Sequence, residues 1–297
     1  MKLKGIFPPM ITPFKENGDV DYEAFVYNVK KWSGTELEGL LVLGSNSETA
    51  FLREDEKLKL IELTVRHAPD KVIMCGTGME TADETIELTN KAADLGADCA
   101  LILTPCFYDA AMKTPALAEY YTTVADNVKI PILVYNVPKF THVNVAVDLI
   151  AQLAKHPNII GMKDSSGDMP QFASFKRVTK EEDFDVFVGT ASALYPALAL
   201  GAAGGILALA NCCPNECVEV YKKYRGGDCE GALETYQRIF PVNTAVTATY
   251  GISGLKWAST LCGYRGGYVR KPLMEQSEKA KEEIKNILLK AEVLEME

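Results

Sequence analysis

Short, almost unbroken runs of hydrophobic residues recur along the chain, and each is followed by a polar or glycine-rich turn and then by a segment with helical periodicity. Eight such runs occur, at residues 5–11, 39–44, 71–76, 99–105, 130–137, 159–164, 184–189 and 204–211. Continuous apolar character, rather than alternation, is typical of strands that helices cover on both sides. The pattern therefore predicts eight strands of a parallel sheet connected by helices.

The segments between these runs carry helix signals. In the segment 81–96, Thr81 is followed by Glu84 in capping-box spacing, and the helical pattern ends at Gly96. Eight β-α units predict a (β/α)8 TIM barrel over residues 1–212. From residue 213 the pattern is all helical, so we expect residues 213–297 to form the last barrel helix and a C-terminal helical extension in the same structural unit.

An open, doubly wound sheet is the alternative fold. It typically has a glycine-rich dinucleotide-binding turn after its first strand. Here the first run is followed by TPFKENGDVD, the stretch GTGMET at residues 76–81 falls short of G-x-G-x-x-G, and no P-loop is present. The motifs therefore favour the barrel.

Composition and charge narrow the function. The 297 residues are 47% hydrophobic and 24% charged, with a net charge of −9, which argues against nucleic-acid binding. The N-terminus lacks the apolar segment of a signal peptide, and no run approaches the roughly 18 apolar residues of a membrane span. We expect a cytoplasmic protein with a small-molecule partner and no membrane association.

Eight cysteines in a chain of this length do not indicate a disulfide scaffold, and most lie in apolar runs. The one cluster, Cys212, Cys213 and Cys217, has no second Cys or His pair at zinc-like spacing, and the three histidines are scattered. We expect buried free thiols and no metal site.

In a (β/α)8 barrel the active site lies at the carboxyl ends of the strands. Polar residues or glycines follow or end seven of the predicted strands: Thr12, the turn GSNSE at residues 44–48, Thr104, Tyr135 with Asn136, Lys163, Gly189 and Asn211. Candidate chemistry is therefore sought among these side chains.

Lys163 and Tyr135 end consecutive strands, which a barrel places side by side. Burial lowers the pKa of a lysine amine and frees its lone pair to attack a ketone. The product is a Schiff base, and Tyr135 is placed to move the protons of the reaction. The alternative is structural: Lys163 forms a salt bridge with a neighbour such as Asp164, and Tyr135 is a half-buried aromatic residue.

The GSNSE turn supplies hydroxyl and N–H groups from Ser45, Asn46 and Ser47. If it begins the next helix, it favours an anion such as a small carboxylate. The alternative is simple helix capping by Ser47, which does not exclude ligand binding.

Three motifs, in this order and on the expected strands, give the chain a family resemblance. They are GSNSE, the stretch YNVP at residues 135–138 and GMKD at residues 161–164. The chain resembles the superfamily of dihydrodipicolinate synthase and N-acetylneuraminate lyase, which are class I Schiff-base aldolases, from end to end. GSNSETAFL and HPNIIGMKDSSGD look most like the branch of 4-hydroxy-2-oxoglutarate aldolase, which yields pyruvate and glyoxylate.

The resemblance implies that Lys163 forms an imine with pyruvate and that Tyr135 shuttles protons, so that no external cofactor is needed. It also implies that the substrate is contacted at neighbouring strand ends, by Ser45 (which also relays a proton) with Asn46 at the carboxylate, and by Ser165, Gly189 and the backbone of Ile206. The implied assembly is a homotetramer.

Two positions depart from the synthase pattern. The synthase arginine that binds the aldehyde's carboxylate is replaced by Phe140, next to Lys139, and the relay tyrosine is replaced by Phe107, next to Tyr108. We therefore expect a pyruvate-dependent aldolase that cleaves a hydroxy-oxo acid such as 4-hydroxy-2-oxoglutarate. The alternatives are dihydrodipicolinate synthase itself, which condenses pyruvate with aspartate semialdehyde, and a barrel that binds an oxo acid without turnover.

Overall fold

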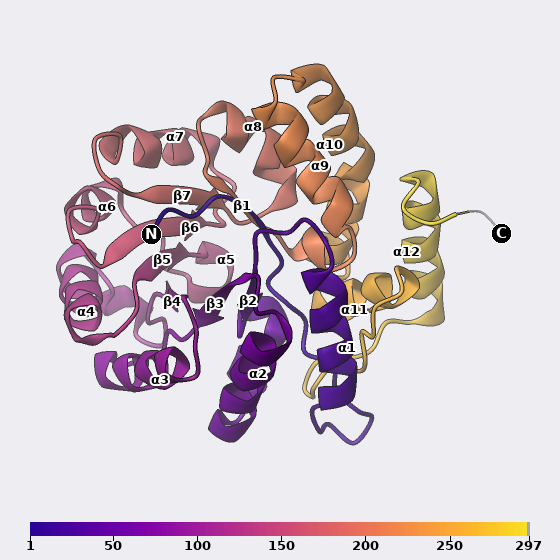
Figure 1. The fold of residues 1–297 in the computed structure, drawn as a ribbon, viewed down its shortest axis with the longest axis horizontal. Coiled ribbons are helices and arrows are strands. Elements are labelled where there is room, and N and C mark those ends of the chain that lie inside the picture. Colours follow the sequence, from indigo (N-terminus) through magenta and orange to yellow (C-terminus); the bar gives the residue numbers. More distant parts are fainter. Residues whose placement is uncertain (296–297) are drawn as a thin grey trace.

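The chain folds into a closed barrel of eight parallel strands. The structure, a computed structural model, describes residues 1–295. The strands follow the order β1-β8-β7-β6-β5-β4-β3-β2 (Figure 1). Their bounds are β1 Gly5–Phe7, β2 Gly39–Val42, β3 Val72–Gly76, β4 Cys99–Leu103, β5 Ile132–Asn136, β6 Ile159–Asp164, β7 Asp185–Val188 and β8 Gly204–Ile206.

The two ends of the sheet meet just beyond β1. Pro9 forms a parallel bridge with Leu41 of β2, and the N–H of Met10 donates to the carbonyl oxygen of Leu41 at 2.9 Å. With β1 already paired to β8, this contact closes the barrel. The predicted (β/α)8 fold is confirmed.

The first and last strands are shorter than their apolar runs. β1 stops at Phe7 because Pro8 and Pro9 have no N–H to offer a ladder. β8 stops at Ile206, and residues 208–211 form a 3₁₀ turn, η5 (Ala208–Asn211), rather than the end of a strand. The prediction of strand structure through residues 11 and 211 was wrong.

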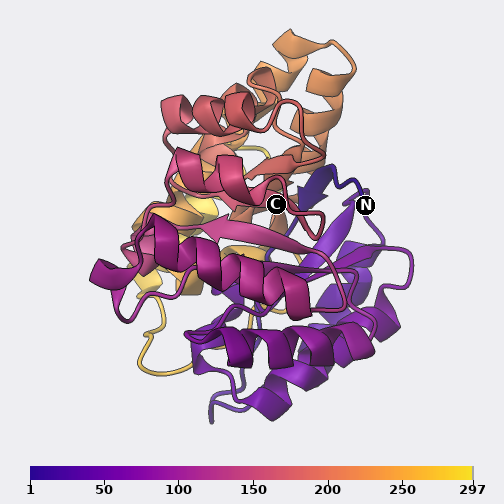
Figure 2. The ribbon, with the colours of Figure 1, turned by 90° about the vertical axis from the view of Figure 1, so that its left-hand side faces the viewer.

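Helices cover the outside of the barrel, side by side (Figure 2). The helices of residues 1–295 are α1 Tyr22–Ser33, α2 Glu54–His67, α3 Ala82–Asp94, α4 Thr114–Asn127, α5 Pro138–Thr141, α6 Val147–Leu153, α7 Met169–Val178, α8 Leu194–Ala199, α9 Pro214–Arg225, α10 Cys229–Thr244, α11 Gly251–Leu261 and α12 Glu278–Lys290. Of these, α5 and the start of α11 lie at the carboxyl ends of the strands rather than on the outside of the barrel. The predicted cap of α3 is present, because Thr81 Oγ1 accepts from the N–H of Glu84 at 3.2 Å. Gly96 follows this helix with a φ of +100°.

Two hydrophobic clusters hold these layers together. The inner one fills the barrel and includes Phe7, Leu133 and Phe187. Phe7 of β1 meets Phe187 of β7 edge to face, with ring centres 5.8 Å apart. The outer one lies between strands and helices and extends from Ile6 to Ile284 in the C-terminal helices. The C-terminal helices thus share one hydrophobic core with the barrel.

All eight cysteines are free thiols, and five of them are buried, as predicted. Within residues 1–295, no three or more His, Cys, Asp or Glu side chains gather closely enough to hold a metal ion. None of the helices described is both long and apolar enough to cross a membrane.

Candidate active site

A cavity of about 540 Å³ opens at the carboxyl ends of β5, β6 and β7. Tyr135 of β5 and Lys163 of β6 line it and are direct partners in the strand register. Lys163 Nζ lies 4.2 Å from the centre of the Tyr135 ring, and the two residues are only 3% and 6% exposed, respectively. The predicted contact of amine and phenol is present, and both groups are largely buried beside the cavity.

The phenol of Tyr135 is electrostatically prepared to lose a proton. Burial alone raises its pKa, but the Lys163 ammonium and polar contacts with Ser45, Ser165 and Lys163 outweigh burial and bring the pKa below 10.0. Tyr135 can therefore exchange a proton with a neighbouring group more readily than an ordinary tyrosine.

Lys163 is free for chemistry because its sequence neighbour is bonded elsewhere. Asp164 accepts from Asn136 Nδ2 and from Ser166 Oγ, each at 2.8 Å. Among the described residues no carboxylate forms a salt bridge with Lys163, so the proposed Lys163–Asp164 pair was wrong. Asp164 and Asn136 instead tie the ends of β5 and β6 together.

The GSNSE turn reaches the site but does not begin a helix. Residues Ser45–Ser47 form a 3₁₀ turn, η1, followed by a second, η2 (Thr49–Phe51), while α2 starts only at Glu54. Ser47 caps no helix, because its hydroxyl donates to the carbonyl oxygen of Met10 at 2.5 Å. Both the helix-start and the capping interpretations were wrong. Ser45 contacts the Tyr135 phenol and Asn46 lines the cavity.

Gly189 follows β7 and packs directly on the reactive lysine. A Cβ at this position would lie 1.8 Å from Ser165 Oγ and 3.0 Å from Lys163 Cε. Ser165 also lines the cavity, and its buried hydroxyl has no hydrogen bond of normal geometry within residues 1–295. Only glycine fits at position 189, because any Cβ there would displace Ser165 and Lys163.

Other candidates from the sequence lie apart from this cavity. Ile206 is fully buried in β8, where it pairs with Phe7 of β1. Asn211 is structural, since its side chain bonds the N–H of Ile11 and the carbonyl oxygens of Pro9 and Ala208. The buried hydroxyls of Thr12 and Thr104 have no hydrogen-bond partner among the described residues, and neither lines the cavity.

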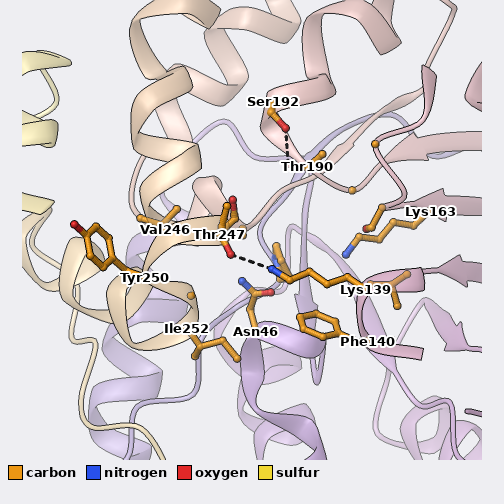
Figure 3. A pocket seen from close by; sticks show the side chains of 18 of the residues that line it. Asn46, Lys139, Phe140, Lys163, Thr190, Ser192, Val246, Thr247, Tyr250 and Ile252 are labelled. Carbon is orange, nitrogen blue, oxygen red and sulfur yellow. Dashed lines mark hydrogen bonds between the residues drawn. The ribbon is translucent and has the colours of Figure 1, made fainter. Parts of the chain in front are cut away.

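The outer wall of the cavity was missed from the sequence. It comes from the C-terminal region, namely the π-helical turn η6 (Ala245–Thr249), the first turn of α11 and residues Leu273 and Met274. Thr190 and Ser192, after β7, add hydroxyls (Figure 3). No local pattern marks these segments as site residues, because they reach the strand ends only through the tertiary fold.

Lys139 and Phe140 of α5 both line the cavity. Lys139 Nζ donates to the carbonyl oxygen of Thr247 at 3.3 Å, so the side chain extends toward the outer wall, while Lys163 enters the same space from β6 (Figure 3). Phe107 and Tyr108 are 78% and 71% exposed, and neither lines this cavity.

Comparisons with known proteins agree on one family. The model of the dihydrodipicolinate synthetase family matches residues 2–291. The chain is 35% identical over 289 residues to 4-hydroxy-tetrahydrodipicolinate synthase of Methanospirillum hungatei JF-1, covering 96% of this chain and 98% of the relative. It is also 35% identical to the synthase of Methanoculleus marisnigri, covering 97% and 99%. These relatives carry the name of the synthase rather than that of the 4-hydroxy-2-oxoglutarate aldolase favoured by the motifs.

Solved structures give the same result. The chain is similar to the chloride-inhibited dihydrodipicolinate synthase of Acinetobacter baumannii complexed with pyruvate, with a TM-score of 0.93, 28% identity and coverage of 99% and 100%. It is equally similar to a prophage protein of this family from E. coli K12 in complex with pyruvate, with a TM-score of 0.93, 28% identity and coverage of 98% and 99%. The chain therefore belongs to the dihydrodipicolinate synthetase family of lyases, which use a lysine Schiff base with pyruvate and no external cofactor.

Proposed function

We propose that this chain is a pyruvate-dependent aldolase in which Lys163 forms the imine and Tyr135 moves the protons. The observation that carries the proposal is the contact of amine and phenol at the floor of the cavity, with Nζ 4.2 Å from the ring centre. Ser45 and Asn46 receive the carboxylate of the oxo acid, with Ser45 also relaying a proton. Gly189 is the further pyruvate contact in this proposal, whereas Ile206, which lies apart from the cavity, is not included.

The steps follow from these positions. The Lys163 nitrogen attacks the ketone carbon of pyruvate, a C–N bond forms, and the ketone oxygen leaves as water. The iminium withdraws electrons, so the methyl carbon loses a proton, through Tyr135, and becomes an enamine. The enamine carbon attacks an aldehyde, whose oxygen takes up a proton, and water then releases the product from Lys163. The reverse sequence cleaves the same bond.

The cavity favours an aldehyde that carries a carboxylate. Its lining in the described chain contains two cationic side chains, Lys139 and Lys163, and no acidic ones. Once Lys163 is engaged as the imine, Lys139 is the remaining cation for a second carboxylate. A lysine lacks the planar fork of arginine, so it holds this group as a point charge. Ser165, which lines the cavity beside Lys163, faces the same fragment in this proposal.

Two reactions fit this description. The names of the relatives favour 4-hydroxy-tetrahydrodipicolinate synthase, which joins pyruvate to aspartate semialdehyde. Phe140, at the place of the synthase arginine, favours the cleavage of 4-hydroxy-2-oxoglutarate to pyruvate and glyoxylate. Both aldehydes carry the carboxylate that Lys139 is placed to meet. In this proposal the exposed aromatic residues Phe107 and Tyr108 contact another subunit of the expected homotetramer.

Steady-state kinetics decide between the two reactions. The purified chain is assayed for condensation of pyruvate with aspartate semialdehyde and for release of pyruvate from 4-hydroxy-2-oxoglutarate, 2-keto-3-deoxy sugar acids and N-acetylneuraminate. Lys163→Ala is the control. We expect Lys163-dependent turnover of one of the first two substrates. Turnover that survives Lys163→Ala, or binding of pyruvate with no turnover of any of these substrates, contradicts the proposal.

A further inference from the structure

The last residue of the GSNSE turn, Glu48, forms a buried ion pair that lies outside the reacting groups. Lys256 Nζ of α11 is 2.5 Å from Glu48 Oε1, and the two side chains are 2% and 0% exposed. The same ammonium donates to the carbonyl oxygen of Tyr268 at 2.5 Å and lies 4.5 Å from the centre of the Phe14 ring. The pair therefore joins the loop after β2 to a helix and a segment of the C-terminal region.

Burying the charges of Glu48 and Lys256 costs free energy of desolvation. Burial raises the pKa of Glu48 and lowers the pKa of Lys256 to about 8, against the attraction between the two charges. Replacing such a pair with apolar residues is often neutral or stabilising, whereas removal of one partner leaves an uncompensated charge. Stability alone is therefore a weak explanation for two charges at this place.

Glu48 fixes the shape of the turn that reaches the site. Its backbone has φ +56° and ψ +37°, a left-handed conformation that residues with a Cβ rarely adopt. Its N–H donates to the carbonyl oxygen of Ser45 at 3.2 Å and closes the turn Ser45–Ser47. A residue in this conformation persists only where its surroundings hold it, and the side chain of Glu48 is held by Lys256.

The pair also connects the turn to the outer wall of the cavity. Glu48 Oε2 accepts from the N–H of Arg270 at 2.8 Å, and the Arg270 guanidinium donates to both oxygens of Glu56 at 2.7 Å. Lys256 is on α11, whose first turn lines the cavity, and Arg270 precedes Leu273 and Met274 at the rim. The Glu48 carboxylate thus contacts two parts of the C-terminal region that lead to the outer wall of the cavity.

We propose that Glu48 and Lys256 are positioning residues whose ion pair holds Ser45 and Asn46 where they receive the carboxylate of the oxo acid. The inference rests on the proposed function, because it assigns that carboxylate to the turn. Loss of the pair weakens capture of pyruvate and leaves Lys163 and Tyr135 in place to react. The expected signature is a raised half-saturating pyruvate concentration with little change in the maximal yield of imine.

The test measures imine formation as a function of pyruvate concentration. Wild type, Glu48→Gln, Lys256→Met, Lys256→Arg and the double variant Glu48→Gln/Lys256→Met are incubated with pyruvate and borohydride and are weighed by intact mass, with melting temperatures recorded in parallel. Leu88→Ala is the matched control, because Leu88 is 6% exposed in α3 and does not line the cavity. It is expected to destabilise the fold without touching the turn.

We expect Glu48→Gln and Lys256→Met to raise the half-saturating pyruvate concentration at least tenfold, the order of effect when a charged hydrogen bond is lost. Lys256→Arg keeps the charge and recovers part of the loss, and Leu88→Ala leaves the concentration unchanged. If the single variants do not fold, the uncharged double variant carries the test. A wild-type pyruvate dependence in folded variants overturns the positioning role alone. If the wild type forms no adduct, or if the adduct also forms in Lys163→Ala, the proposed function itself is overturned.

Discussion

Replacement of Gly189 with alanine is expected to damage both the fold and the reaction. The new Cβ would lie 1.8 Å from Ser165 Oγ, 2.8 Å from Ser165 Cβ and 3.0 Å from Lys163 Cε, whereas real Cβ atoms hardly ever approach a heavy atom within 3.0 Å. The backbone is held by hydrogen bonds: the N–H of Gly189 donates to the backbone carbonyl oxygen of Asp164 at 2.7 Å, and the N–H of Ser165 donates to that of Asn136 at 2.8 Å. The side chains of Ser165 and Lys163 must therefore move.

The size of the effect follows from this crowding. Overpacking a filled site lowers the free energy of unfolding by about 1–3 kcal/mol, and displacement of a reacting group by roughly 1 Å reduces turnover about 100-fold. Thermal unfolding and steady-state turnover measure the two effects. Gly34→Ala is the control, since its Cβ would meet nothing closer than 3.5 Å. The double variant Gly189→Ala/Ser165→Gly removes the closest contacts and recovers part of the stability. A Gly189→Ala variant with wild-type melting temperature and turnover refutes the packing described for Lys163.

Three further outcomes are expected. Tyr135→Phe lowers turnover by about 10²- to 10⁴-fold. The nearby Lys163 and the polar neighbours lower the pKa of Tyr135, so the phenol contributes to a rise of the wild-type rate with pH that begins below the range of an ordinary tyrosine. A Tyr135→Phe variant with wild-type turnover contradicts this role. Lys139→Met is expected to raise KM for the aldehyde about tenfold, and Phe140→Arg is expected to lower KM for aspartate semialdehyde. Unchanged KM values in both variants contradict the assignment of Lys139 to the carboxylate of the aldehyde. At pH 8 a thiol reagent is expected to modify the exposed Cys229 first and Cys106 slowly, because the pKa of Cys106 is raised to about 11. Peptide masses identify the modified residues. Prompt labelling of the five buried thiols contradicts the core packing.

The barrel was predictable from the sequence because its strands are covered by helices and read as continuous apolar runs. The ends of β1 and β8 were not, since their apolar runs continue past the last ladder bonds into Pro8–Pro9 and into the turn η5. Hydrophobicity alone does not distinguish a strand from a buried 3₁₀ turn. The error at the GSNSE turn has a similar origin, because serines that suit a helix cap also suit the irregular turn that Glu48 closes.

Lys163 and Tyr135 were predictable as a pair because consecutive strands of a barrel are neighbours, and their register makes the two residues direct partners. The Glu48–Lys256 pair and the wall from η6, α11 and Met274 were not. These contacts join segments far apart in the chain, and no periodicity or spacing links a loop after the second strand to a helix after the eighth.

Trapping of the imine tests the proposed chemistry most directly. The chain is incubated with pyruvate and borohydride, the intact mass is measured, and the modified residue is mapped by peptide sequencing. We expect one reduced pyruvate adduct per chain, located on Lys163 and absent from Lys163→Ala. No adduct, or an adduct that remains in Lys163→Ala, would contradict the Schiff-base mechanism.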